Sequence, residues 1–316
     1  MRFTSNKRIT FALRAGISIL LLIGLLLKTD STEIAHAFLE ISPATWLITF
    51  VLYLCSQFLS SFRWYLIAHA VGFKGKWNTY LGYYFVGMYF NLFMPSSIGG
   101  DVLKVLFLSR EYKQKLKAAY TVLADRVFGL AAMFLLGSLA VIIAPDAIPM
   151  RLKLILIGTT FLVYISPFAL IGLNNLIRKR WPEISQRVDI TLQLLKNKQT
   201  VVFVLLISLL LQFIGMNILV ILAKDMGLSP PPSFYYAIFP LVTLMTFLPI
   251  SLNGIGIRET GFAYFLSLKD IPMEKALILS LSFFAIQVAA ALVGGGAYIW
   301  GAHKRSITAP IITHEG

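Results

Sequence analysis

Long apolar runs dominate the sequence. A helix needs about 20 mostly apolar residues to cross a hydrocarbon core of about 30 Å. Runs of about this length or longer lie near residues 10–27, 44–68, 118–143, 152–173, 200–223 and 275–300. The pattern predicts six full transmembrane helices. We interpret the first as retained, because no small-residue cleavage motif follows it.

Two further apolar stretches, near residues 79–110 and 233–266, are interrupted in the middle by Pro, Gly and polar residues. The interruptions span 94–101 and 248–256, and the pieces on either side are too short to cross. Irregular backbone at membrane depth must be buried in protein or line a wet cavity. The pattern favours two re-entrant hairpins of two half-helices each. A kinked full-length helix, or a loop between two short spans, is the alternative.

Composition supports an all-α integral membrane protein. Of the 316 residues, 58% are hydrophobic and 13% charged, whereas soluble domains are about 45–50% apolar and about 25% charged. Mean hydropathy is +0.78. These values exclude a soluble enzyme, a disordered chain and a disulfide scaffold. With a single cysteine, Cys55, and four scattered histidines, the sequence predicts no metal site and no cofactor.

We attribute the net charge of +14 to cytoplasmic loops rather than to nucleic acid binding, because Lys and Arg collect in the cytoplasmic loops of membrane proteins. With a cytoplasmic N-terminus and both hairpins returning to their own side, 17 Lys and Arg lie in the cytoplasm and 6 outside. The C-terminus, with a short tail over 301–316, is then also cytoplasmic. If only one interrupted stretch crossed fully, the basic loop at 178–198 would lie outside.

The two interruptions also indicate an internal repeat within one membrane domain over 1–316. Pro95 and Pro249 lie 154 positions apart, which is close to half the chain. Each half, about 10–143 and 152–300, then holds three full spans and one hairpin. Because three crossings is an odd number, the second half is inverted relative to the first. Inverted repeats with discontinuous helices near the midplane are typical of secondary transporters.

Charged residues at membrane depth are the candidate functional residues, because a charge in hydrocarbon costs about 2.5–3.5 kcal/mol on insertion scales. Helix N-termini and Arg side chains suit an anionic headgroup, and glycine permits close approach of the backbone. The candidate substrate-binding residues are Arg63, Gly99, Gly100, Asp101, Lys104, Asp125, Arg126, Asn253, Gly254, Gly256, Arg258 and Glu259. The acids balance the cations or carry protons.

Structural roles are the alternative for several of these residues. The charges can form an ion-pair network that closes the bundle, Arg63 can reach the inner interface, and Asp101 can cap its half-helix. For the uncharged polar residues at depth, hydrogen bonds between helices are the favoured interpretation. These residues are Asn91, Gln212, Asn217 and Gln287.

Three motifs resemble the transmembrane, flippase-like domain of lysylphosphatidylglycerol synthases. They are the segments 91–101 (NLFMPSSIGGD), 118–129 (AAYTVLADRVFG) and 248–259 (LPISLNGIGIRE). The resemblance extends over about residues 10–300. Asn253 departs from the family pattern, in which Gly is commoner. The resemblance implies a stand-alone member. Only about 15 residues follow the last span, so we expect no cytosolic aminoacyltransferase domain and no lysyl transfer.

The expected function is translocation of an anionic phospholipid, polyprenyl or glycolipid headgroup across the bacterial inner membrane. An ion-coupled transporter of a small soluble anion is the second hypothesis. An enzyme acting on a lipid phosphate is the third and least favoured, because no base–nucleophile set can be assembled. The sequence lacks a Walker motif, so ATP is not expected to drive the process within this chain. It specifies neither an oligomeric state nor a particular lipid.

Overall fold

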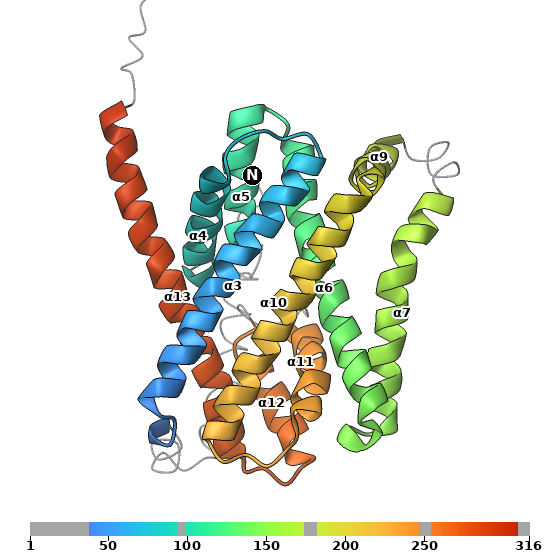
Figure 1. Ribbon diagram of the computed structural model, residues 1–316, viewed down its shortest axis with the longest axis vertical. Helices are drawn as coiled ribbons and strands as arrows, with labels where there is room; N and C mark the ends of the chain where they lie inside the picture. The colour runs from blue at the N-terminus through green and yellow to red at the C-terminus, as the bar shows by residue number, and fades with distance from the viewer. Residues whose placement is uncertain (1–37, 94–98, 174–181, 247–253, 309–316) are drawn as a thin grey trace, which may run out of the picture.

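The protein is an all-helical integral membrane protein (Figure 1). The computed structural model describes residues 38–93, 99–173, 182–246 and 254–308. Within these residues five helices are long and apolar enough to cross a membrane. They are α3 (Pro43–Ala70), α6 (Lys115–Ile143), α7 (Met150–Gly172), α10 (Lys198–Asp225) and α13 (Met273–Thr308). They confirm five of the six predicted spans; the sixth, at 10–27, lies outside the described residues.

Four shorter helices form two neighbouring pairs. The first pair is α4 (Trp77–Phe93) and α5 (Gly99–Tyr112), and the second is α11 (Pro232–Thr246) and α12 (Ile257–Ser267). Each is shorter than the roughly 20 residues that a full crossing needs. Figure 1 shows the first pair in the upper half of the molecule and the second in the lower half. Most of the two predicted interruptions, at 94–98 and 248–253, lies outside the described residues. Of the remainder, residues 99–101 are the first turn of α5, and residues 254–256 form a turn that leads into α12.

Local capping explains where two of the long helices begin. The Ser42 hydroxyl accepts the N–H of Thr45, and Asn197 accepts the N–H of Thr200, so each satisfies an otherwise free donor in the first turn. The backbone N–H of Ser42 also donates to Asp225 Oδ2 over 2.6 Å. This bond ties the start of α3 to the end of α10, and the two helices pack along each other.

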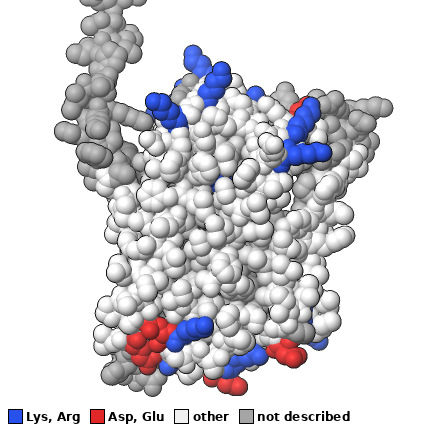
Figure 2. Space-filling view, in the orientation of Figure 1, with Lys and Arg blue, Asp and Glu red and all other residues white. Residues whose placement is uncertain are grey.

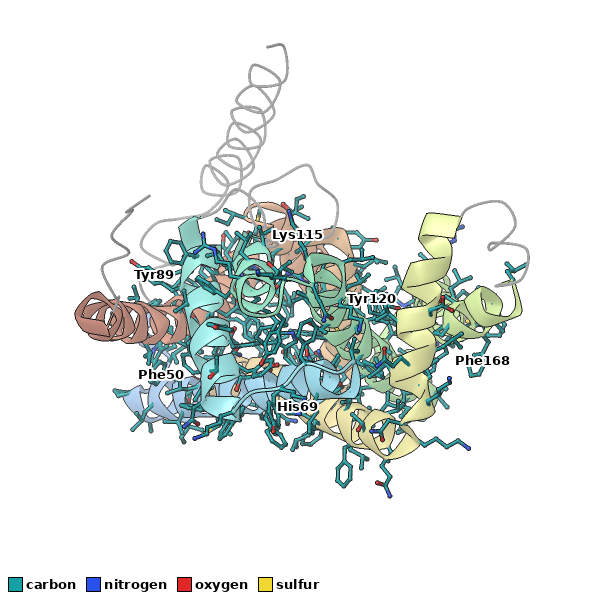
Figure 3. The ribbon with its side chains drawn as sticks, turned by 90° about the horizontal axis from the view of Figure 1, so that it is seen from above. Phe50, His69, Tyr89, Lys115, Tyr120 and Phe168 are labelled. Atoms are coloured by element: carbon teal, nitrogen blue, oxygen red, sulfur yellow. The ribbon has the colours of Figure 1, made fainter. Side chains whose placement is uncertain are left out.

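Two helices lie at the margin of the bundle. The helix α9 (Pro182–Lys196) packs Ile190 and Leu194 against α3, α6 and α10. Helix α7 packs mainly on α6, where Tyr164 donates to the Ala131 carbonyl over 3.3 Å. Seen from above, Phe168 of α7 points away from the bundle (Figure 3). The outer face of α7 is apolar, as a lipid-facing surface requires.

Close backbone contact joins α4 to α5. A Cβ atom at Gly100 would lie 1.9 Å from the Gly87 carbonyl oxygen, and one at Gly87 would lie 2.9 Å from the Gly100 oxygen. Small residues allow membrane helices to approach this closely. Van der Waals packing, rather than the hydrophobic effect, then holds the helices together. Asn91 Oδ1 accepts the Gly100 N–H over 2.6 Å, which adds a hydrogen bond to the same contact.

We expect Gly100→Ala to lower the stability of the detergent-solubilised protein by about 1–3 kcal/mol, because the added methyl group overpacks the α4–α5 contact. Gly82→Ala is the matched control, since a Cβ on this α4 residue meets nothing within 4 Å. The control should melt at or slightly above the wild-type temperature. Thermal unfolding followed by intrinsic fluorescence compares them, and equal melting temperatures for the two variants would contradict the contact.

Candidate functional site

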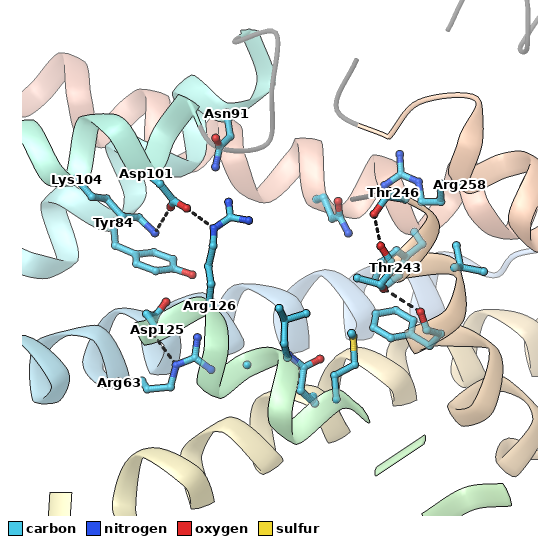
Figure 4. A pocket seen from close by; sticks show the side chains of 18 of the residues that line it. Arg63, Tyr84, Asn91, Asp101, Lys104, Asp125, Arg126, Thr243, Thr246 and Arg258 are labelled. Carbon is cyan, nitrogen blue, oxygen red and sulfur yellow. Dashed lines mark hydrogen bonds and ion pairs between the residues drawn. The ribbon is translucent and has the colours of Figure 1, made fainter. Parts of the chain in front are cut away.

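A cavity of about 430 Å³ lies inside the bundle (Figure 4). Residues from both halves of the chain line it. Its charged lining residues are Arg63, Asp101, Lys104, Asp125, Arg126 and Arg258. All six are candidates from the sequence. The structure therefore brings together charges that are spread over almost 200 positions of the chain.

Arg63 and Asp125 form a buried ion pair beside the cavity. Arg63 Nε donates to Asp125 Oδ1 over 2.7 Å, and both side chains are more than nine-tenths buried. Arg63 Nη1 also donates to Ser208 Oγ over 3.0 Å. One guanidinium thus connects α3, α6 and α10. Arg63 does not reach out to the membrane surface, and its charge is matched within the bundle.

Asp101 bridges two cations on the α5–α6 side of the cavity. Its carboxylate accepts a hydrogen bond from Arg126 Nε and lies 3.3 Å from Lys104 Nζ (Figure 4). Lys104 Nζ also lies 3.8 Å from the centre of the Tyr84 ring, a cation–π distance. Asp101 lies in the first turn of α5, where an acid also suits the helix dipole. Asp101 is therefore the counter-ion of both Lys104 and Arg126.

Glu259 holds Arg258 at the opposite side of the cavity. Glu259 Oε1 lies 3.3 Å from Arg258 Nε and accepts from Ser280 Oγ over 3.2 Å, while Oε2 accepts the Gly256 N–H over 2.6 Å. Glu259 is almost fully buried and is not among the cavity-lining residues. Its geometry is that of a helix cap and a positioning residue for Arg258. Arg258 Nη2 is buried without a hydrogen-bond partner among the described residues.

The candidate glycines shape the helix starts around the cavity and are not among its lining residues. Gly99 begins α5, and Gly100 forms the close contact with Gly87. Gly254 and Gly256 have φ values of +77° and +86°, a region that L side chains rarely adopt, and the turn they form leads directly into α12. Asn253 lies outside the described residues.

Several uncharged polar residues complete the lining. They are Tyr84, Asn91, Gln212, Thr243, Thr246 and Gln287. Helix-to-helix bonding is confirmed for Asn91, through Gly100, and for Asn217, which donates to Tyr236 over 2.6 Å. It is wrong for Gln212 and Gln287, which make no hydrogen bond to any described residue and line the cavity instead.

Sequence reasoning did not single out Thr243 or Thr246 as site residues. The two threonines lie three positions apart on α11, so they share a helix face just before the second interruption. This spacing is the sequence feature from which the two threonines could have been identified. Within the described residues no three His, Cys, Asp or Glu side chains lie close enough to hold a metal ion.

We expect Asp125→Asn to destabilise the protein by about 3–5 kcal/mol, because it leaves the buried Arg63 guanidinium without a counter-charge. The double variant Arg63→Met/Asp125→Leu removes both charges and should recover much of this loss. Unfolding in detergent, measured by fluorescence, provides the comparison. If Asp125→Asn unfolded like wild type, the pair would not hold the three helices together.

Comparisons with known proteins agree with the resemblance in the three motifs. The sequence model of the lysylphosphatidylglycerol synthase TM region matches residues 11–295, which is nearly the whole chain. No curated protein matches the chain. Since the match extends over far more than half of the residues and includes every charged residue of the cavity, the chain belongs to the lysylphosphatidylglycerol synthase transmembrane family.

Proposed function

We propose that the protein is a flippase-like translocator that moves the anionic headgroup of a membrane lipid between leaflets. The observation that carries the proposal is the cavity itself, which places Arg63, Lys104, Arg126 and Arg258 around one space inside an apolar bundle. Intramembrane charges that face a cavity mark substrate pathways. Arginine forms two parallel hydrogen bonds to phosphate, which favours a phosphate-bearing headgroup over other anions.

The two pairs of short helices support a transport mechanism. We propose that α4–α5 and α11–α12 are re-entrant hairpins in two inverted repeats, which together with six full spans make up the membrane domain. Their position in opposite halves of the molecule favours this arrangement (Figure 1). Inverted repeats can exchange roles, so the cavity can open to one side and then to the other.

Charge at the two ends of the bundle supports an orientation. In Figure 2 Lys and Arg gather at the upper end, whereas acidic and basic residues mix at the lower end. The segment before α4 and the start of α6, with Lys76 and Lys115, lie at the upper end, and the segment between α6 and α7 and the start of α7, with Asp146 and Lys153, lie at the lower end (Figure 1). We propose that the upper end and both termini face the cytoplasm of a bacterial inner membrane, because positive loops stay inside.

Reconstitution tests translocation directly. Purified protein in vesicles that contain fluorescently labelled phosphatidylglycerol should expose inner-leaflet lipid to an external quencher faster than empty vesicles do, with or without a pH gradient. Arg126→Gln and Arg258→Gln should each lower the rate by roughly 10-fold or more, because each removes a charge-assisted contact worth about 1.5–3 kcal/mol.

Lys115→Gln is the matched control, because this exposed residue lies on the same helix as Arg126 and does not line the cavity. It should retain the wild-type rate. A folded protein that moves no lipid across a panel of anionic headgroups would end the proposal. Uptake of radiolabelled inorganic phosphate by such vesicles would instead favour the soluble-anion transporter.

Cysteine labelling tests the hairpins and the orientation. In a Cys55→Ser background, Lys76→Cys and Lys115→Cys flank the first helix pair, and Ser229→Cys and Ser267→Cys flank the second. In intact cells an impermeant maleimide should label only the second two, whereas permeabilised cells should show all four. If the two sites flanking either pair differed in accessibility, that pair would cross the membrane and the re-entrant hairpin would be excluded.

A further inference from the structure

We propose that a side chamber next to the central cavity binds a monovalent inorganic anion such as chloride. The side chamber has a volume of about 150 Å³ and lies between α3, α4 and α13, which provide its polar lining residues Tyr53, Asn91 and Gln287. Asn91 and Gln287 also line the central cavity, so the two spaces adjoin. An anion bound in the side chamber does not require that the protein translocate lipid.

The side chamber collects hydrogen-bonding groups that the protein does not use itself. The Tyr53 hydroxyl and the Gln287 amide make no hydrogen bond to any described residue. Asn91 accepts the Gly100 N–H through Oδ1, and its Nδ2 group has no hydrogen-bond partner among the described residues. Unpaired polar groups at membrane depth are unfavourable, so these three need water or a ligand. All three can donate an O–H or N–H, which suits a ligand that only accepts.

The charges around the two spaces favour an anion over a cation. Four cations line the central cavity and three carboxylates contact them, so the described residues of this cluster carry one positive charge in excess. Segments 94–98 and 247–253 contain no charged residue. No Asp or Glu among the described residues lines the side chamber. A monovalent anion neutralises the excess, and the attraction is strong because little water screens it inside the bundle.

Cationic groups lie on two sides of the side chamber. Asp101 is the counter-ion of two cations, one of them Arg126, and Asn91 is bonded to the residue that precedes Asp101. On the other side Arg258 lies 4.5 Å from the centre of the Phe284 ring, which lines the side chamber, and Arg258 Nη2 is buried without a partner among the described residues. Figure 4 shows Asn91 and Arg126 towards one side of the central cavity and Arg258 towards the other. A bound anion is thus attracted from both sides.

The size and lining of the side chamber limit the ligand to a small ion. Its volume of about 150 Å³ is below the range of small-molecule sites, about 300–1,000 Å³, which excludes a lipid headgroup from the side chamber itself. A halide ion with a few water molecules fits. Met88, Leu92 and Ala291 form apolar walls, so the ion must give up part of its hydration shell. Chloride and bromide meet that condition better than a strongly hydrated or bulky anion does.

Thermal unfolding of the purified protein in detergent tests the site. Sodium chloride, sodium bromide and sodium gluconate are compared at equal ionic strength. We expect chloride and bromide to raise the melting temperature by roughly 2–5 °C over gluconate, because a ligand that binds only the folded state stabilises it. The rise should saturate as the halide concentration increases. Equal melting temperatures in chloride and gluconate, or a rise that does not saturate, overturn the proposal.

Two variants test whether the ion binds in the side chamber. Tyr53→Phe and Gln287→Leu each remove one donor and should raise the chloride concentration for half-maximal stabilisation by roughly 10-fold, because each loses a charge-assisted hydrogen bond to the anion. Neither variant breaks a hydrogen bond to the described residues, so both should fold. If both keep the wild-type half-maximal concentration, the side chamber does not hold the ion and the proposal fails.

Gln212→Leu is the matched control. Like Gln287, Gln212 makes no hydrogen bond to any described residue, but it lines the central cavity and not the side chamber. This variant should keep the wild-type response to chloride. A loss of the response as large as that in Gln287→Leu would place the anion in the central cavity and overturn the assignment to the side chamber.

Discussion

An ionised side chain inside a hydrocarbon layer must be paired or in contact with water, and this constraint organises the centre of the bundle. Asp125 is the ion-pair partner of Arg63, and Asp101 is the ion-pair partner of Lys104 and Arg126. Each pairing joins residues from different turns or different helices. Because lipid tails are as apolar as leucine side chains, hydrophobic burial does little to hold such helices together. Ion pairs and close backbone contacts, such as Gly87 against Gly100, therefore carry much of the specificity of packing.

The same pairs fix the positions of charged side chains that line the cavity. Buried ion pairs fix side-chain positions at a cost in desolvation, which makes them poor sources of stability and good sources of orientation. Glu259 illustrates this, because one carboxylate caps α12 and positions Arg258. The guanidinium then lies 4.5 Å from the centre of the Phe284 ring and faces the cavity. A bound phosphate would meet groups whose ordering cost is already met by the fold.

The bundle combines an apolar exterior with a polar interior. The outer face of α7 exposes large hydrophobic side chains, whereas the cavity collects charged and amide groups. A soluble protein reverses this arrangement. The polar interior is consistent with a lipid whose headgroup crosses through the protein while its acyl chains remain in the surrounding bilayer. The two halves of the chain also provide different chemistry to the cavity, so the proposed repeat in architecture does not imply a symmetric site.

The sequence alone determined the membrane class, five described spans and the family, because 20-residue apolar runs and short motifs are local features. It also identified the charges at depth, since an ionised residue in an apolar run is conspicuous. Only the tertiary structure decided their roles. Asp101 and Glu259 look alike in sequence, yet one lines the cavity and the other caps a helix. Gln212 and Gln287 face the cavity because of how α10 and α13 are rotated and packed. Hydropathy does not encode that rotation, since lipid, protein and cavity can each border an apolar helix.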